Sequence, residues 1–152
     1  MASQLALAVI EPAILDHLRT DGALLALVRD AGDGNFGIYD FVPQGTPRNQ
    51  LYPYVRVSGG SERPFNTLGT ESALKYGSIA VVTVRAVSQS RGSQEVYGVM
   101  SAVKARLDGR KLTFGSYGAA IVTCEHVVPL TDQVGGVITR ELVAEFDVTV
   151  HQ

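Results

Sequence analysis

The fold of this chain is decided by residues 75–107, KYGSIAVVTVRAVSQSRGSQEVYGVMSAVKARL. The first part, Lys75 to Ser88, is rich in β-branched residues and predicts one long strand. After a short polar turn, apolar residues recur at helical spacing on one face, namely Val96, Val99, Met100, Val103 and Leu107. A strand that leads into a helix able to lie across the same sheet is typical of a small α+β domain.

Three further strands are expected after this helix. Gly109 is placed to end the helix, and Lys111 to Phe114 is predicted as a short edge strand. Ala119 to Leu130 is predicted as a long strand that stops near Pro129, followed by a hairpin loop from Thr131 to Gly136.

The last strand, Val137 to His151, alternates from Leu142 onward. One face carries Leu142, Ala144, Phe146, Val148 and Val150, and the other carries Glu141, Val143, Glu145, Asp147 and Thr149. This alternation is typical of a half-buried antiparallel strand.

Before the central strand, two helices are expected. The first runs from a Ser3 cap to about Arg19, with Pro12 either bending it or standing in the first turn of a helix that starts near Glu11. The second is a short piece from Ala23 to Val28.

Two short strands and two loops complete the N-terminal half. The strands are Phe36 to Val42 and Pro53 to Ser58, and Gln44 to Leu51 is a loop between them. Gly59 to Ala73 is predicted as a long irregular loop, and loops of this length are often functional. The whole pattern predicts an α+β fold, with a mostly antiparallel sheet of about four to five strands and with the N-terminal helices and the central helix on one face.

The composition excludes several classes of protein. The 152 residues predict a single domain, 1–152, and the formal charge of -2 argues against a general nucleic-acid binder. The single cysteine, Cys124, excludes an internal disulfide and fits a reducing compartment or a virion component assembled in one. Neither a signal peptide nor an apolar run long enough to span a membrane is visible, so a cytoplasmic soluble protein is expected.

Two literal motifs are interpreted as ordinary structure. Residues 32–37, GDGNFG, match G-x-G-x-x-G, but a helix precedes them and a strand follows, so a turn is predicted instead of a dinucleotide site. Ser101 and Lys104 form an S-x-x-K pair off the apolar helix face, without the other motifs of penicillin-binding sites, which favours a solvated helix surface.

The polar residues of the last strands offer weaker candidates. Cys124 and His126 are expected on the same side of their strand, and with Glu125 they are the one arrangement that suggests a small enzyme or ligand-binding site. A zinc site needs three or four ligands, and no third is in sight. The carboxylates of the last strand are expected to face Arg85 or Arg56 on a neighbouring strand.

The order of elements resembles the tail-completion, or tail-terminator, proteins of long-tailed bacteriophages and related gene-transfer particles. The resemblance rests on a helix pair (Ile10 to Val28), a glycine turn into residues 37–40 (GIYD), and the strand start at residues 52–57 (YPYVRV). It continues with a long loop, a strand, a helix that opens with Ser90, Ser93 and Glu95, and a closing hairpin with Asp132 and with Thr139-Arg140 leading to Val150.

This resemblance implies a structural virion protein without catalysis or cofactor. Six copies would form a ring on the head-proximal end of the tail tube, assembled in the host cytoplasm. The ring would stop tube polymerisation and contact the tail tube protein and a head-side connector or head-completion protein. It implies no membrane partner and no sequence-specific nucleic acid, with DNA passing through the ring's central channel. The alternatives left open are a head-completion or tail-tube subunit, or the small domain centred on Cys124 and His126.

The family fixes no contact residues by motif, so the candidates come from composition and expected exposure. They lie in the predicted loops and in the closing hairpin. The predicted partner-binding residues are Arg48, Arg63, Phe65, Asn66, Glu71, Asp132, Gln133 and Arg140.

Overall fold

The computed structural model describes residues 5–67 and 75–151, which form one mixed sheet covered by helices. The sheet has the strand order β1-β2-β3-β6-β5-β4. Every neighbouring pair is antiparallel except β1 and β2, which are parallel. The strands are β1 (Ile38–Tyr39), β2 (Tyr54–Thr67), β3 (Lys75–Ser88), β4 (Arg110–Thr113), β5 (Ala119–Val134) and β6 (Val137–His151).

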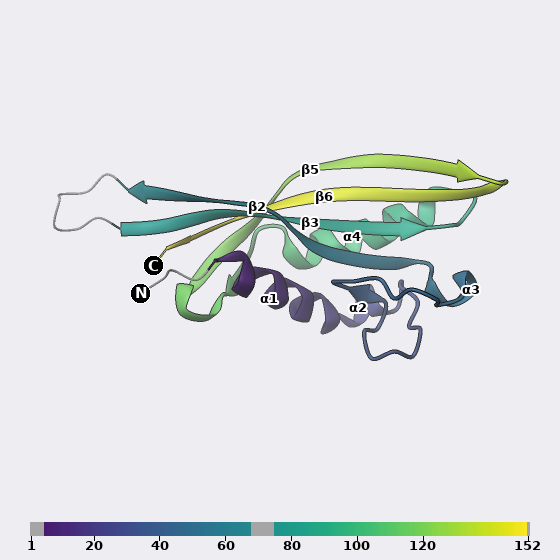
Figure 1. Cartoon of the computed structure of the whole chain (residues 1–152), viewed down its shortest axis with the longest axis horizontal. Coiled ribbons are helices and arrows are strands. Elements are labelled where there is room, and N and C mark those ends of the chain that lie inside the picture. The colour runs from purple at the N-terminus through teal and green to yellow at the C-terminus, as the bar shows by residue number, and fades with distance from the viewer. Residues whose placement is uncertain (1–4, 68–74, 152) are drawn as a thin grey trace.

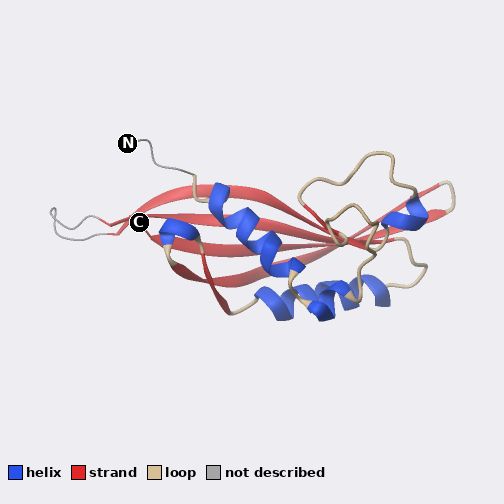
Figure 2. Ribbon diagram, turned by 90° about the horizontal axis from the view of Figure 1, so that it is seen from below, coloured by secondary structure: helices blue, strands red, loops and turns tan. Residues whose placement is uncertain are grey.

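The two long helices lie on the same face of this sheet (Figure 1, Figure 2). The helices are α1 (Leu7–Arg19), α2 (Gly22–Leu25), α3 (Arg48–Leu51) and α4 (Gln94–Leu107), with a short 3-10 turn at Gly115–Tyr117. The predicted α+β class and the one-sided helix layer are confirmed. The sheet has six strands instead of four to five, because the short strands β1 and β4 each occupy an edge. The single-domain organisation of residues 1–152 stays a prediction.

The core lies between the helices and the inner face of β3 and β6. Strand β3 has the predicted bounds, and its residues Ala80, Val82, Val84 and Ala86 are fully buried. The alternating apolar residues of β6 and the predicted apolar stripe of α4 are buried as well. The three long strands β3, β6 and β5 pair antiparallel as expected, in that order.

Helix α1 begins at Leu7 and continues through Pro12, so the alternative of a start near Glu11 is wrong. Ser3, the predicted cap, lies outside the described residues. Ala6 provides no side-chain cap; instead, the Glu62 carboxylate of β2 accepts hydrogen bonds from the backbone N–H groups of Ala6 (2.8 Å) and Leu7 (3.0 Å). A carboxylate at this position satisfies free N–H groups and complements the positive end of the helix dipole.

Strand β2 corrects the prediction of a long loop from Gly59 to Ala73. The strand continues to Thr67 and pairs with β3 over this whole length, with a register shift between Gly59 and Ser61. A Cβ atom on Gly60 would lie 3.0 Å from the backbone oxygen of Val81, so glycine permits the close approach at this bulge. The turn-forming residues were misleading because the pairing with β3 overrides local preference.

Strand β5 was predicted to stop near Pro129, and this is also wrong. It continues to Val134, and the hairpin turn consists of Gly135 and Gly136, both with positive φ. The β4 strand covers only residues 119–122 of β5, so Pro129 lies on the edge of the sheet, where a missing N–H is tolerated.

The remaining differences are short. The strand expected from Phe36 to Val42 is reduced to β1, because Phe36 and Gly37 have positive φ values that end the extended backbone. A Cβ atom on Gly37 would lie 2.5 Å from the Arg29 backbone oxygen. Helix α2 ends at Leu25 instead of Val28, and the loop from Gln44 to Leu51 contains α3.

We expect the substitution Glu62→Ala to destabilise the fold, because α1 then loses the acceptor for its first two N–H groups. Loss of a helix N-cap costs about 1 kcal/mol. Urea denaturation followed by circular dichroism measures this free energy. The exposed Asp132→Ala is the matched control for removal of a carboxylate, and an equal loss of stability in both variants would contradict a capping role for Glu62.

Candidate assembly surfaces

Those predicted partner-binding residues whose side chains the structure describes lie toward two opposite ends of an elongated sheet. The β2–β3 hairpin extends from one end and the β5–β6 hairpin from the other (Figure 1). Arg63 is exposed near the end of β2, whereas Asp132 and Gln133 are exposed near the end of β5. Glu71 lies outside the described residues, and so do the side chains of Arg48, Phe65 and Asn66. The candidates therefore represent two surfaces and not one site.

Asp132 and Gln133 lie in a paired strand and not in a loop as predicted. Asp132 is opposite Thr139, and Gln133 is opposite Ile138. Their side chains are exposed because this part of β5 is an edge of the sheet.

Arg140, the last of the candidates, is partly buried and bound to another part of the chain. Its Nη2 donates to the backbone oxygen of Arg91 (2.9 Å), and its Nε is buried. The side chain thereby ties β6 to the turn between β3 and α4, which favours a structural role over direct contact with a partner.

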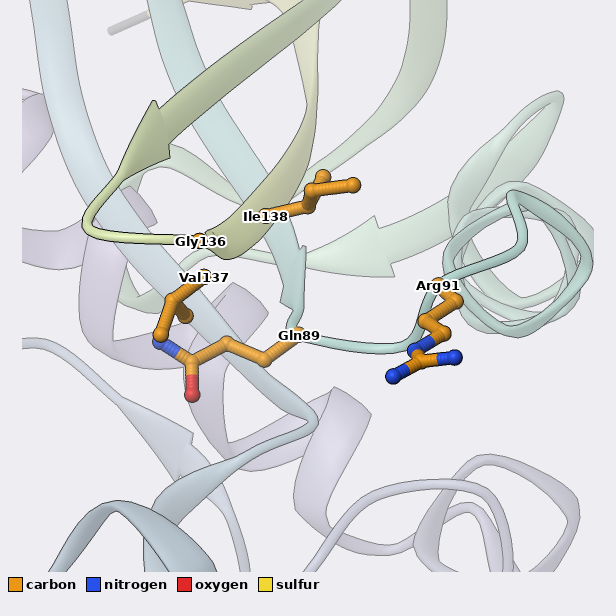
Figure 3. A pocket seen from close by; sticks show the side chains of 5 residues that line it. All are labelled: Gln89, Arg91, Gly136, Val137 and Ile138. Atoms are coloured by element: carbon orange, nitrogen blue, oxygen red, sulfur yellow. The ribbon is translucent and has the colours of Figure 1, made fainter.

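A shallow pocket of about 430 Å³ opens at the end of the sheet that carries the β5–β6 hairpin. Gln89 and Arg91 come from the turn after β3, Gly136 comes from the β5–β6 turn, and Val137 and Ile138 come from the start of β6 (Figure 3). One cation, one amide and two apolar side chains suit a polar or acidic protein surface. Sequence reasoning missed these residues, because nothing local indicates that this turn meets the hairpin.

The turn that carries Gln89 and Arg91 is fixed by Ser88. Its buried hydroxyl donates to the Glu95 carboxylate of α4 and accepts a hydrogen bond from the Ser90 backbone N–H (3.1 Å). The start of α4 is therefore tied to the end of β3, and the pocket side chains project from a constrained backbone.

The outer face of the sheet carries paired charges. Arg85 on β3 donates to Glu141 on β6 at 2.6 Å, which confirms the predicted contact between the last strand and its neighbour. The His126 Nε2 atom lies 3.6 Å from Glu145 Oε2. Glu125 instead faces Asp147, and this second carboxyl raises the pKa of Glu125 above its ordinary value.

The Cys124–His126 arrangement is wrong as predicted, because a β-bulge separates the two side chains. Cys124 pairs with Phe146, whose side chain is in the core, whereas His126 pairs with Glu145 on the outer face. The two side chains therefore lie on opposite faces of the sheet. Burial raises the pKa of the Cys124 thiol, which disfavours the reactive thiolate.

The two literal motifs are confirmed as ordinary structure. Gly32, Gly34 and Gly37 all have positive φ in a turn that leads into β1, and α2 ends before it. Ser101 and Lys104 are both exposed on α4.

A second pocket, of about 360 Å³, is lined by His17, Arg106, Arg110, Lys111 and Leu112. Arg106 donates to the His17 backbone oxygen (3.4 Å) and Arg110 to the Ala105 backbone oxygen (3.3 Å). These carbonyls belong to the last turns of α1 and α4, so both guanidinium groups serve to stabilise helix ends. Burial, followed by the charge of Arg106, lowers the pKa of His17.

Within residues 5–67 and 75–151, no group of three or more His, Cys, Asp or Glu side chains is arranged to hold a metal ion. In the same part of the chain, no helix has the length and apolar character needed to cross a lipid bilayer.

Comparisons with known proteins point to one family. The family model described as "Tail completion protein gp17" matches residues 12–150. Its description is structural and names no enzymatic activity. A search of curated proteins finds no match.

Chains of solved structures resemble this fold, and two of them are described below. A chain from "Virion of native gene transfer agent (GTA) particle" aligns with a TM-score of 0.71 and 21% identity, covering 99% of this chain and 100% of that chain. At this identity, the likeness shows a shared fold. A second chain, 17% identical over 97% of this chain and 96% of that chain, has a TM-score of 0.47, too low to support an argument.

We expect Glu125→Gln to stabilise the protein at neutral pH. The native pKa of Glu125 lies above its value in the unfolded chain, so stability falls as the pH rises above the unfolded-chain pKa, and the full cost is reached above the native pKa. The gain should vanish below the ordinary Glu pKa of 4.5, where both states are protonated. Thermal denaturation of both proteins between pH 4 and pH 7 measures it, and salt should reduce it. A gain that is equal at all pH values would contradict repulsion between Glu125 and Asp147.

Proposed function

Because the chain belongs to the tail completion protein gp17 family, we propose that it caps the head-proximal end of the tail tube of a phage-like particle. The protein acts as a ring of identical subunits, six by the family resemblance. The ring ends tube polymerisation and forms part of the joint between tail and head. Its neighbours are the tail tube protein on one side and a head-side connector or head-completion protein on the other.

The observation that carries this proposal is the family match, which spans residues 12–150 and therefore includes nearly all of the sheet. The chain follows the whole GTA virion chain at a TM-score of 0.71, so the fold is one that occurs in a virion. These findings support a component of a phage-like particle that completes a tail, and the capping role is the finer proposal.

The shape of the subunit suits a ring that contacts two different partners. The exposed residue Arg63 and the pocket beside Gln89 and Arg91 lie toward opposite ends of the long sheet. A subunit whose long axis is inclined to the tail axis would still present one end to the tube and the other to the head side. Each end then contacts a different protein, as a joint requires.

Two neighbouring roles remain within the same particle. A tail-tube subunit would polymerise into long tubes by itself, whereas a cap would not. A head-completion protein would bind the head-side connector without requiring a tube. The enzyme alternative has no support from the bulged Cys124–His126 segment.

Native mass spectrometry with negative-stain imaging of the purified protein tests the ring. We expect closed rings of about six subunits, either free in solution or on added tail tubes, because identical subunits with unlike contacting surfaces close into rings. Long tubes formed by the protein alone would identify a tube subunit. A monomer that neither forms rings nor binds added tubes would contradict the proposal.

We also expect the double substitution of Arg63→Ala and Phe65→Ala to weaken attachment to isolated tail tubes without unfolding the protein. Both residues belong to the β2–β3 hairpin, which we assign to the tube side. Sedimentation of tubes with bound protein measures attachment, and circular dichroism checks the fold. The double substitution of Ser101→Ala and Lys104→Ala changes the exposed face of α4 and is the control. Equal binding by both variants and the wild type would contradict this assignment.

A further inference from the structure

The two short edge strands of the sheet, β1 and β4, are protected against pairing with another strand. At β1, Arg19 donates to the Ile38 backbone oxygen from both Nε (3.1 Å) and Nη2 (2.8 Å). At the other side, β4 is only four residues long and carries Arg110 and Lys111. Short edge strands and basic side chains are common means of preventing edge-to-edge association.

Strand β5 lacks this protection over its second half. β4 pairs with β5 only as far as Val122, and the Asp108 carboxylate accepts from the Cys124 N–H (2.9 Å). From His126 to Val134, no described strand lies on the outer side of β5. This segment also exposes apolar side chains: Val128 is 43% exposed, Leu130 is 48% exposed and Val134 is 70% exposed. An unpaired edge with exposed apolar residues is a template for a further strand.

The direction of the backbone groups follows from the hairpin. A two-residue turn makes its flanking residues, Val134 and Val137, a hydrogen-bonded pair, and such pairs alternate along an antiparallel ladder. The odd-numbered residues Val127, Pro129, Thr131 and Gln133 therefore direct their backbone groups away from β6. Pro129 agrees with this alternation, because its missing N–H would face away from β6.

The same alternation, traced through β6 and β3, identifies a second free edge on β2. Val55 N donates to the Gly37 backbone oxygen, so this residue faces β1 as the alternation requires. Beyond the β1 contact, Val57, Glu62, Pro64 and Asn66 direct their backbone groups away from β3, and no described strand covers them. The β2 and β5 edges lie on opposite sides of the sheet.

We propose that the β5 edge of one subunit pairs with the β2 edge of a second copy of this chain, and that this contact closes the ring. The proposal rests on the ring proposed above and assigns the interface between its subunits. Two different edges on opposite sides of one molecule make a heterologous contact, which every subunit can repeat around a ring. The exposed Asp132 on β5 and the exposed Arg63 on β2 give the two edges opposite charges.

The stagger of the two edges fits a closed arrangement. Leu130 lies in the middle of the free β5 edge and pairs with Glu141 on β6. Glu141 pairs with Val87 on β3, and Val87 pairs with Tyr54 on β2, so Leu130 and Tyr54 lie at the same level of the sheet. The middle of the free β2 edge is near Glu62, seven ladder positions farther along when the extra residue of the bulge is discounted, which corresponds to about 23 Å. Across the four strands β2, β3, β6 and β5, about 19 Å wide, this shift gives a strand tilt of about 50°, slightly above the tilt of about 35–45° in closed barrels.

Each edge also carries one proline, and this limits how the edges can pair. Pro64 and Pro129 remove one donor each but leave the other backbone groups available. Registers in which the two prolines face each other leave both opposing carbonyls without a donor. The prolines thus disfavour indiscriminate pairing while permitting selected registers.

Disulfide cross-linking tests the contact. In a Cys124→Ser background, Thr131→Cys is combined in turn with Ser58→Cys, Ser61→Cys or Arg63→Cys, and assembled rings, on tail tubes where needed, are mildly oxidised. We expect at least one combination to give a ladder of covalent oligomers up to the full ring on a denaturing gel. The single Thr131→Cys variant should stay monomeric, and so should its combination with Ser101→Cys on exposed α4.

The outcomes separate the two proposals. Rings without a ladder in any of the three combinations would overturn the assigned interface and leave the capping role standing. Dimers from the single Thr131→Cys variant would show β5 pairing with β5 and would also overturn it. Neither rings nor ladders, even with tubes present, would overturn the ring and the interface together.

Lysine substitutions provide a second readout. The double substitution of Val128→Lys and Val134→Lys should reduce ring formation more than about tenfold, since both residues lie opposite valines of β6 and the lysines brought into the paired edge would lack partners. The matched control is Ile121→Lys, which changes a 58% exposed apolar residue in the part of β5 that β4 covers. Native mass spectrometry measures the ring fraction, and an equal effect of both changes would contradict the proposal.

Discussion

The antiparallel ladder between β3 and β6 is the constraint on which the rest of the structure depends. These two strands occupy the middle of the sheet, and their inward residues form the surface that α1 and α4 cover. Burial of this continuous apolar face supplies the main driving force for the fold. The outward residues of the same strands include charged side chains, so Arg85 and Glu141 can pair across the ladder on the other face. One face of the ladder thus contributes to the hydrophobic core, and the other face carries the charged surface groups.

The helices are joined to this ladder by a few long-range polar contacts. The Glu62 carboxylate fixes the start of α1 to β2, and Arg19 fixes its end to β1. Ser88 fixes the start of α4 to the end of β3 through Glu95. Each contact satisfies helix-end or strand-edge groups that would otherwise need water. The Arg19 contact closes the β1 edge. None of these contacts involves the second half of β5, which stays uncovered.

The elements that could be predicted from the sequence are those whose pattern is local. Strand β3, helix α4 and the alternating strand β6 have strong periodicity, and their bounds and buried faces follow from it. The second halves of β2 and β5 could not be predicted in this way. Gly59, Gly60 and Pro129 suggest breaks, but a partner strand supplies the hydrogen bonds that hold these residues in a strand. The bulge at Cys124 is likewise invisible to simple alternation, and it reversed the predicted side of His126.

The candidate contact surfaces were predictable only in part, for a related physical reason. Exposure of Asp132 and Gln133 follows from their polarity, but their place on an uncovered edge depends on how far β4 extends along β5. Arg140 looks like a surface cation in the sequence, yet it binds the Arg91 carbonyl, because the fold brings that turn beside β6. An edge is a property of the assembled sheet, since any strand can lie at an edge or inside. Edge prolines such as Pro129 are the one local sign, because a proline in a long strand requires that one side of the strand lack a paired neighbour at that position. In the ring proposed above, Pro129 thus marks an edge that is open in the single subunit and that a second copy would cover.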